Sequence, residues 1–276
     1  GYAWTYLRIS AVGLPFILIT MAGTGYLRGE QDARTPLYVA VGTAIGNLVV
    51  ELWFVYGLDM GIAGSAWSTV MAEAAGGIIY AVLVARAVIA RGASTRPDFG
   101  VIATSARMGV HLVVRTLALR GAFVLAVVIA ATMGTTELAA HEIATQIWFL
   151  LALALDAIAI AGQALVARHL GAGDTVTARD ASRRMVELSV LFGVAVAVVL
   201  IAVARPLSGV FSNDTEVVEL AAFLMLFVAA VQPIGGHVFA LDGILIGAGD
   251  LAYLGRAMWV SFLVFAALGG LVLATG

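Results

Sequence analysis

The 276-residue chain has no cysteine and no lysine, and only 12% of its residues are charged. The absence of cysteine excludes disulfide bonds and thiolate metal sites, and four scattered histidines do not form a metal-binding motif. With a formal net charge of -2 and no basic patch, the sequence is not that of a nucleic-acid-binding protein. Apolar residues make up 62% of the chain, which predicts an integral protein of the lipid bilayer.

The sequence also lacks the short signatures of common enzymes, since it contains no HExxH, GxSxG, Walker or paired-cysteine motif. Two Gly-Ala-Gly-Asp turns, at 171–174 and 247–250, are similar to phosphate-binding loops. They lack the preceding strand of such loops, so we interpret them as helix C-caps followed by an N-cap aspartate. We therefore predict neither an enzyme nor a bound cofactor or metal ion.

Eight apolar runs are long enough to cross the bilayer as helices. Their length, and the lack of strict alternation of apolar and polar residues, disfavour membrane-spanning strands. The predicted fold class is therefore an all-α, polytopic membrane protein. The spans cover roughly residues 9–27, 36–58, 61–90, 108–133, 138–168, 185–204, 217–248 and 251–275.

The stretch from Met133 to Asp174 is a membrane-spanning helix with a polar turn at its start and a glycine-rich turn at its end. Its apolar run contains the carboxylates Glu142 and Asp156. A carboxylate near the bilayer centre costs about 2.5 to 3.5 kcal/mol on insertion scales, so such residues usually serve a function. The alternative interpretation, for residues near the end of a span, is that the side chain reaches the lipid headgroups or water.

Further polar residues inside the spans are candidates for a substrate and ion pathway. Asn47 and Glu51 are four residues apart and share one helix face. Arg115 and Asp156 lie 20 and 21 positions from the turn at Thr135, which places them at nearly equal depth and predicts a salt bridge, either static or broken during transport. The predicted pathway residues are Asn47, Glu51, Arg115, Arg120, Gln146, Asp156 and Asp242.

Arginines are concentrated in alternate loops, which indicates the orientation of the spans. The loops on the other side carry only Arg205, and Arg8 at the start of the first span is an exception. The arginine-rich loops are therefore predicted to be cytoplasmic. They carry Arg28, Arg34, Arg86, Arg91, Arg96, Arg107, Arg168, Arg179, Arg183, Arg184 and Arg256.

The first and seventh spans are copies of each other at an offset of 218 residues. The offset pairs Pro15 with Pro233, Gly25 with Gly243 and Asp32 with Asp250. A repeat unit of six helices would insert both copies in the same orientation. The two prolines each remove a helical hydrogen bond, and we interpret them either as packing kinks or as hinges.

Both ends of the chain lie in or beside apolar helices, and the chain starts at Gly1 rather than at a methionine. We therefore expect it to be an internal portion of a longer protein.

Five segments together resemble the multidrug and toxic compound extrusion (MATE) transporters, in particular the DinF-like branch. Their order and spacing match the family along the whole chain. They are GYLRGEQDARTPLY (25–38), GLDMGIAGSAWSTVMAE (57–73), LAAHEIATQIW (138–148), ALDAIAIAGQALVARHLGAGD (154–174) and LDGILIGAGD (241–250).

The resemblance implies family helices four to eleven of twelve, arranged as two six-helix lobes that export organic cations, drugs or other amphiphiles in exchange for protons or sodium. Residues 1–97 would be three helices of the first lobe, and residues 98–276 five helices of the second. The implied protein is a monomeric, multi-pass transporter in the bacterial plasma membrane that binds a small-molecule substrate.

The chain departs from the family pattern at one position that bears on ion coupling. Many sodium-coupled members have an acidic residue after the Gln-Pro of helix ten, whereas here Gln232 and Pro233 are followed by isoleucine and glycine. Asp242, two turns further on, belongs to the DinF-like pattern instead. The resemblance therefore leaves sodium coupling through the second lobe open.

Three other functions remain as alternatives. A lipid-linked oligosaccharide flippase of the same superfamily would share the architecture and line its cavity with cationic residues. Arg115 and Arg120 support this alternative. A non-transporting membrane scaffold would not need charges inside several spans. A channel is disfavoured because the chain has kinked helices and no repeat typical of a selectivity filter.

The orientation is tested by introducing single cysteines into this cysteine-free chain. We expect Arg91→Cys and Arg179→Cys to react only with reagent on the cytoplasmic side and Asp59→Cys only with reagent outside, because the arginine bias fixes the cytoplasmic loops. The measurement is labelling of intact cells by an impermeant thiol reagent. Labelling of position 91 from outside would contradict the orientation.

Overall fold

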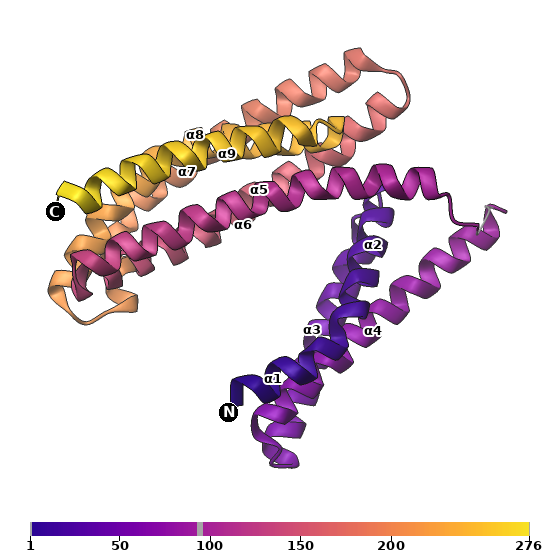
Figure 1. Cartoon of the computed structure of the whole chain (residues 1–276), viewed down its shortest axis with the longest axis horizontal. Coiled ribbons are helices and arrows are strands. Elements are labelled where there is room, and N and C mark those ends of the chain that lie inside the picture. Colours follow the sequence, from indigo (N-terminus) through magenta and orange to yellow (C-terminus); the bar gives the residue numbers. More distant parts are fainter. Residues whose placement is uncertain (1, 93–95, 276) are drawn as a thin grey trace. The chain divides into compact units, whose positions relative to one another are not determined.

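The computed structural model describes residues 2–92 and 96–275 of the chain. Over these residues it is helical, and eight helical segments are long and apolar enough to cross a membrane, as predicted. The chain divides into two compact units, Gly1–Pro97 (unit 1) and Asp98–Gly276 (unit 2). Figure 1 shows the helices of both units.

Unit 1 contains three membrane-spanning segments. The first consists of α1 (Tyr2–Ser10), a one-turn 3₁₀ helix η1 (Ala11–Gly13) and α2 (Leu14–Gly29). The second is α3 (Arg34–Leu52) followed by a π-helical turn η2 (Trp53–Gly57), and the third is α4 (Gly61–Ala90). The helix α4 packs against both other segments and is therefore the centre of the unit.

The break in the first segment coincides with Pro15. Because proline has no N–H, it cannot donate to the carbonyl of Ala11, and the N–H of Leu14 bonds to that carbonyl instead. The matching Pro233 lies inside the continuous helix α8 (Thr215–Ala248). The two prolines thus have different local structures.

The ends of α2 and α4 are joined by an ion pair between Glu30 and Arg91, whose guanidinium also donates to the Tyr26 hydroxyl. The hydrogen bond from Arg91 holds the pKa of Glu30 below its ordinary value. Both residues lie at the arginine-rich end of unit 1, where charged groups are expected to reach water.

Unit 2 contains five long helices that run roughly parallel or antiparallel to one another (Figure 1). They are α5 (Phe99–Met133), α6 (Thr135–Gly171), α7 (Thr175–Phe211), α8 and α9 (Leu251–Thr275). The helix α8 packs along both α6 and α7, while α5 packs mainly along α9. Unit 2 is therefore a three-helix group, α6 to α8, beside a helix pair.

The core of the three-helix group consists of small and medium apolar side chains. Met225 and Ala221 of α8 are fully buried there, and Ala140 of α6 lies beside them. Large apolar side chains such as Leu150 and Leu153 are more than 60% exposed instead. This arrangement suits a bilayer, because lipid tails are as apolar as leucine and helices associate through close packing.

Glycines on α8 allow the closest helix contacts. Gly236 lies against the backbone of Ser189 in α7, and Gly243 lies against the backbone of Ala159 in α6. A Cβ at either position would overlap a carbonyl oxygen of the neighbouring helix. The backbones of α6, α7 and α8 therefore approach at distances that no other residue allows.

The loop residues cap the helices as predicted. Asp174 caps α7 by accepting from the N–H of Thr177, and the side-chain hydrogen bond from Thr177 lowers the pKa of Asp174. Gly249 ends α8 in the left-handed conformation, and Asp250 then accepts from the N–H of Tyr253. The two Gly-Ala-Gly-Asp turns are thus helix ends, as interpreted from the sequence.

We expect Gly243→Ala to destabilise unit 2 by about 1 to 3 kcal/mol, because the new methyl group forces α6 and α8 apart. The matched control is Gly235→Ala on the same helix, where a Cβ would meet only Leu155 Cδ1, at 3.8 Å. The measurement is the midpoint of thermal unfolding of the purified protein in detergent. Equal midpoints for the two variants would contradict the close contact at Gly243.

Candidate functional site

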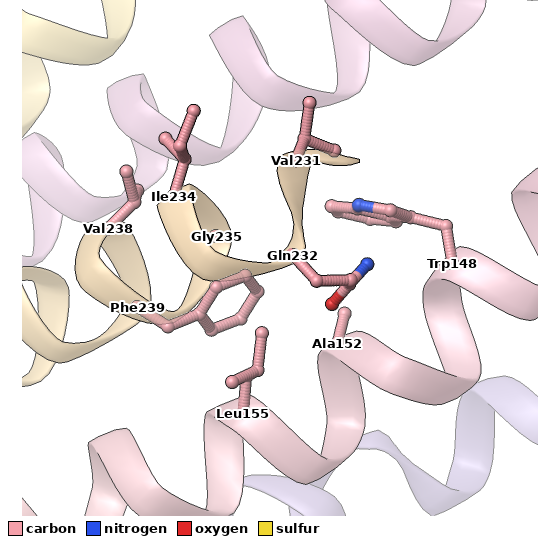
Figure 2. A pocket seen from close by; sticks show the side chains of 9 residues that line it. All are labelled: Trp148, Ala152, Leu155, Val231, Gln232, Ile234, Gly235, Val238 and Phe239. Atoms are coloured by element: carbon pink, nitrogen blue, oxygen red, sulfur yellow. The ribbon is translucent and has the colours of Figure 1, made fainter. Parts of the chain in front are cut away.

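A pocket of about 240 Å³ lies between α6 and α8 of unit 2. Figure 2 shows the Gln232 side chain pointing toward Trp148 and Ala152 from the opposite helix. The lining is otherwise apolar and aromatic, which is typical of sites for small organic molecules. It consists of Trp148, Ala152, Leu155, Val231, Gln232, Ile234, Gly235, Val238 and Phe239.

The pocket lining continues along both helices into two carboxylates. On α6, Trp148 and Ala152 are four residues apart, and the next position on this stripe is Asp156. On α8, Gly235 and Val238 are followed on the same face by Asp242. The two carboxylates therefore lie next to the same end of the pocket.

Arg115 of α5 binds the Asp242 carboxylate with two hydrogen bonds. Its Nε donates to Oδ1 at 3.1 Å and its Nη2 donates to Oδ2 at 2.6 Å. Only 21% of the arginine side chain and 18% of the aspartate side chain are exposed. This two-point geometry is the strong form of an arginine–carboxylate pair.

The predicted salt bridge between Arg115 and Asp156 is therefore wrong. Equal depth on α5 and α6 was not sufficient, because α5 packs mainly along α9 and its arginine reaches the third helix of the group, α8. Asp156 is exposed and makes no ion pair in the described part of unit 2. It is close enough to act electrostatically on Asp242.

The three ionisable groups leave a surplus of negative charge at the pocket end. With Arg115 carrying one positive charge and Asp156 and Asp242 one negative charge each, the sum is -1 when both aspartates are ionised. A cation or a proton near Asp156 balances this charge. The arrangement thus favours positively charged ligands over anionic ones.

Two other predicted pathway residues lie outside this group. Arg120 is exposed on α5, and Gln146 is exposed on α6, where its amide donates to the Glu142 carboxylate at 2.8 Å. Gln146 therefore interacts with a residue one turn away on its own helix. Neither residue lines the pocket.

In unit 1 the predicted residues Asn47 and Glu51 are half-buried on α3. The Ser65 hydroxyl of α4 donates to Glu51 Oε1 at 2.6 Å, and the Asn47 Oδ1 oxygen is buried without a hydrogen-bond partner. Oxygen ligands of this kind suit a proton or a hard cation. No group of three histidine or acidic residues that would hold a metal ion occurs among the described residues.

Gln232 was not among the predicted pathway residues, although it is 3% exposed and contributes the amide of the pocket. The available signal was a polar side chain next to a proline in the middle of an apolar span. Such a residue is costly in lipid and therefore usually faces the protein interior.

Comparison with known proteins identifies the family. The MatE family model matches residues 1–53 and 112–272. Protein DETOXIFICATION 43 of Arabidopsis thaliana is 33% identical over 258 residues, which are 93% of this chain and 48% of that protein. DNA damage-inducible protein F of Escherichia coli (strain K12) is 27% identical over 298 residues, covering 98% of this chain and 64% of that protein.

Solved structures show the same fold. A crystal structure of a MATE protein in complex with MaL6 aligns with a TM-score of 0.83 at 18% identity, covering 94% of this chain and 60% of that one. The Vibrio cholerae MATE transporter VcmN in its bent form aligns with a TM-score of 0.72 at 20% identity. The chain spans about half the length of the plant relatives it matches.

The matched family model covers part of each unit, DNA damage-inducible protein F is among the similar proteins, and the solved fold covers 94% of the chain. The chain belongs to the MATE family of membrane transporters.

Proposed function

We propose that the protein is a secondary active efflux transporter, which exports organic cations, drugs or other small amphiphiles in exchange for protons or sodium. The observation that carries this proposal is the pocket of unit 2, where an aromatic, apolar lining ends at a group of net negative charge. An amphiphilic cation has the complementary structure. No enzymatic step is involved.

The pocket offers a separate contact for each part of such a substrate. Trp148 presents an indole ring to an apolar or cationic group, and Gln232 presents an amide. Asp156, one turn beyond Ala152 on α6, would balance a positive charge. A cation over an indole ring gains about 0.5 to 2 kcal/mol, depending on how far it is desolvated. Affinity for a variety of amphiphiles is therefore possible without a rigid set of hydrogen bonds.

The coupling ion is proposed to bind in unit 1 at Asn47 and Glu51. A buried amide oxygen without a partner and a carboxylate one turn away provide acceptor oxygens for a proton or sodium ion. In this proposal unit 1 belongs to the first six-helix lobe and unit 2 to the second, and Pro15 and Pro233 act as hinges. The transporter is proposed to act as a monomer in the plasma membrane of a bacterium.

The flippase alternative receives less support from the site. Such a protein would use arginines to bind anionic phosphate groups, but Arg115 is already neutralised by Asp242. Arg120 remains exposed as a single cation. The scaffold alternative gives no reason for a carboxylate pair beside an aromatic pocket.

The ion pair is tested by a double-mutant cycle. We expect Arg115→Gln and Asp242→Asn each to lower the stability by about 1 to 3 kcal/mol, less than the loss at a fully buried pair, because both side chains remain partly exposed. The coupling energy is measured from thermal unfolding in detergent. The control cycle combines Arg115→Gln with Asp156→Asn, and a larger coupling in this control would contradict the observed pairing.

The substrate site is tested by efflux of a fluorescent aromatic cation in everted vesicles that contain the protein at its natural length. We expect Trp148→Leu to raise the apparent KM about fivefold, equivalent to about 1 kcal/mol of lost ring contact. The control is Trp259→Leu, since Trp259 also packs against a phenylalanine but lies on α9. An equal effect of the two variants contradicts the pocket assignment.

The exchange itself is tested in the same vesicles by collapsing the pH gradient or removing sodium. We expect one of these treatments to abolish efflux in the unmodified protein, and Glu51→Gln to remove the dependence on that ion. Efflux that continues after both treatments would exclude a proton- or sodium-coupled antiporter.

A further inference from the structure

Unit 1 contains a half-buried glutamate, Glu73, that the proposed exchange does not use. Glu73 lies in α4, 12 residues after Gly61 and 17 residues before Ala90. At about 1.5 Å per residue it lies about 18 Å from one helix end and about 26 Å from the other, within the hydrocarbon region. Its Oε2 oxygen is buried and has no hydrogen-bond partner.

The Glu73 carboxyl packs directly against the break in the first segment. Gly13 is buried at the end of η1, and a Cβ on Gly13 would overlap the carboxyl group of Glu73. One turn earlier, the Ser10 hydroxyl is also buried without a partner. The absence of a side chain at Gly13 therefore creates the space that the carboxyl group occupies.

No ion pair compensates Glu73 in the described part of unit 1, and its Oε2 oxygen has no hydrogen-bond donor there. The segments packed against α4 are α1, η1, α2, α3 and η2. Their titratable or charged side chains are exposed, lie at helix ends, or in the case of Glu51 bond to Ser65. These groups are Tyr2, Tyr6, Arg8, Tyr26, Arg28, Arg34, Tyr38, Glu51 and Tyr56, and α4 itself adds Tyr80 and Arg86.

The surroundings of Glu73 have a direct chemical consequence. A carboxylate with a buried oxygen, no donor and no cation loses its hydration without compensation, whereas the protonated acid is neutral. Ionisation therefore requires water to reach the carboxyl group. Water reaches the carboxyl group most easily at the break, because the 3₁₀ turn and Pro15 already interrupt the helical hydrogen bonds there.

We propose that Glu73 is a proton-binding site at the break between α1 and α2, and that the break opens to water when the proton leaves. The step transfers the proton from the carboxylic acid to water and leaves the carboxylate hydrated. The proposal goes beyond the proposed exchange because it concerns a different carboxyl group and links protonation to the shape of the first segment.

The opening is measured by thiol labelling, without any transport assay. Ser10→Cys places a thiol at the break in a cysteine-free background, and Ser68→Cys places a reference thiol at a fully buried position on α4. The protein is tested at its natural length in membranes with a small impermeant reagent. The readout is the labelling rate at position 10 divided by the labelling rate at position 68. This ratio removes the effect of thiol ionisation, which changes both rates with pH.

We expect this ratio to rise about tenfold when the pH is raised far enough to ionise the Glu73 carboxyl group. In the Glu73→Gln background, which keeps the shape but cannot ionise, we expect a constant ratio. A constant ratio in the parent protein overturns the proposal. The same rise in the Glu73→Gln background also overturns it.

A second pair of variants tests the contact without changing the glutamate. Gly13→Ala places a methyl group where the carboxyl group lies, while Gly25→Ala on α2 meets nothing within 4 Å. We expect Gly13→Ala to give a high labelling ratio already at the acidic end of the pH series, and Gly25→Ala to behave as the parent does. Identical behaviour of these two variants overturns the contact and with it the proposal.

Infrared spectroscopy provides an independent readout of the proton. We expect the parent protein at low pH to show a carbonyl stretching band of a protonated carboxylic acid that Glu73→Gln removes. The absence of such a difference overturns proton binding at Glu73. Failure of the efflux assays would leave all these results unchanged, so the two proposals are separable.

Discussion

The absence of water inside a bilayer is the constraint on which this structure depends. Every buried backbone group must be satisfied within its own helix, so all eight spans are helical and the few interruptions are single turns. A charge in the same environment needs a partner or a path to water. Asp242 has a partner in Arg115, and Glu73 lies against a helix break.

The same constraint explains where large and small residues lie. Because lipid provides no hydrophobic driving force between helices, contact depends on how closely the backbones approach. Gly236 and Gly243 bring α8 against α7 and α6, while leucines such as Leu150 and Leu153 face outward. The resulting three-helix group holds Trp148 and Gln232 across from each other, which forms the pocket.

The charge near the end of this pocket depends on how Arg115 is paired. A free Arg115 would attract anions to the site, but two hydrogen bonds pair this arginine with Asp242. The neighbouring carboxylate, Asp156, makes no ion pair in the described part of unit 2. A residue that taken alone favours a phosphate-binding flippase is thus, in its structural context, one half of an ion pair.

The sequence by itself determined the fold class, the number of spans and the helix caps, because hydropathy and turn chemistry are local properties. It also indicated Glu51, Arg115, Arg120 and Asp156 as polar residues too costly to be idle in lipid. Only the tertiary structure decided the partner of Arg115, the place of Gln232 in the pocket and the contact of Glu73 with Gly13. Each of these depends on which helices are neighbours. Because the apolar helices of a membrane protein have similar surfaces, close backbone packing selects the neighbours, and no pattern along the sequence predicts them.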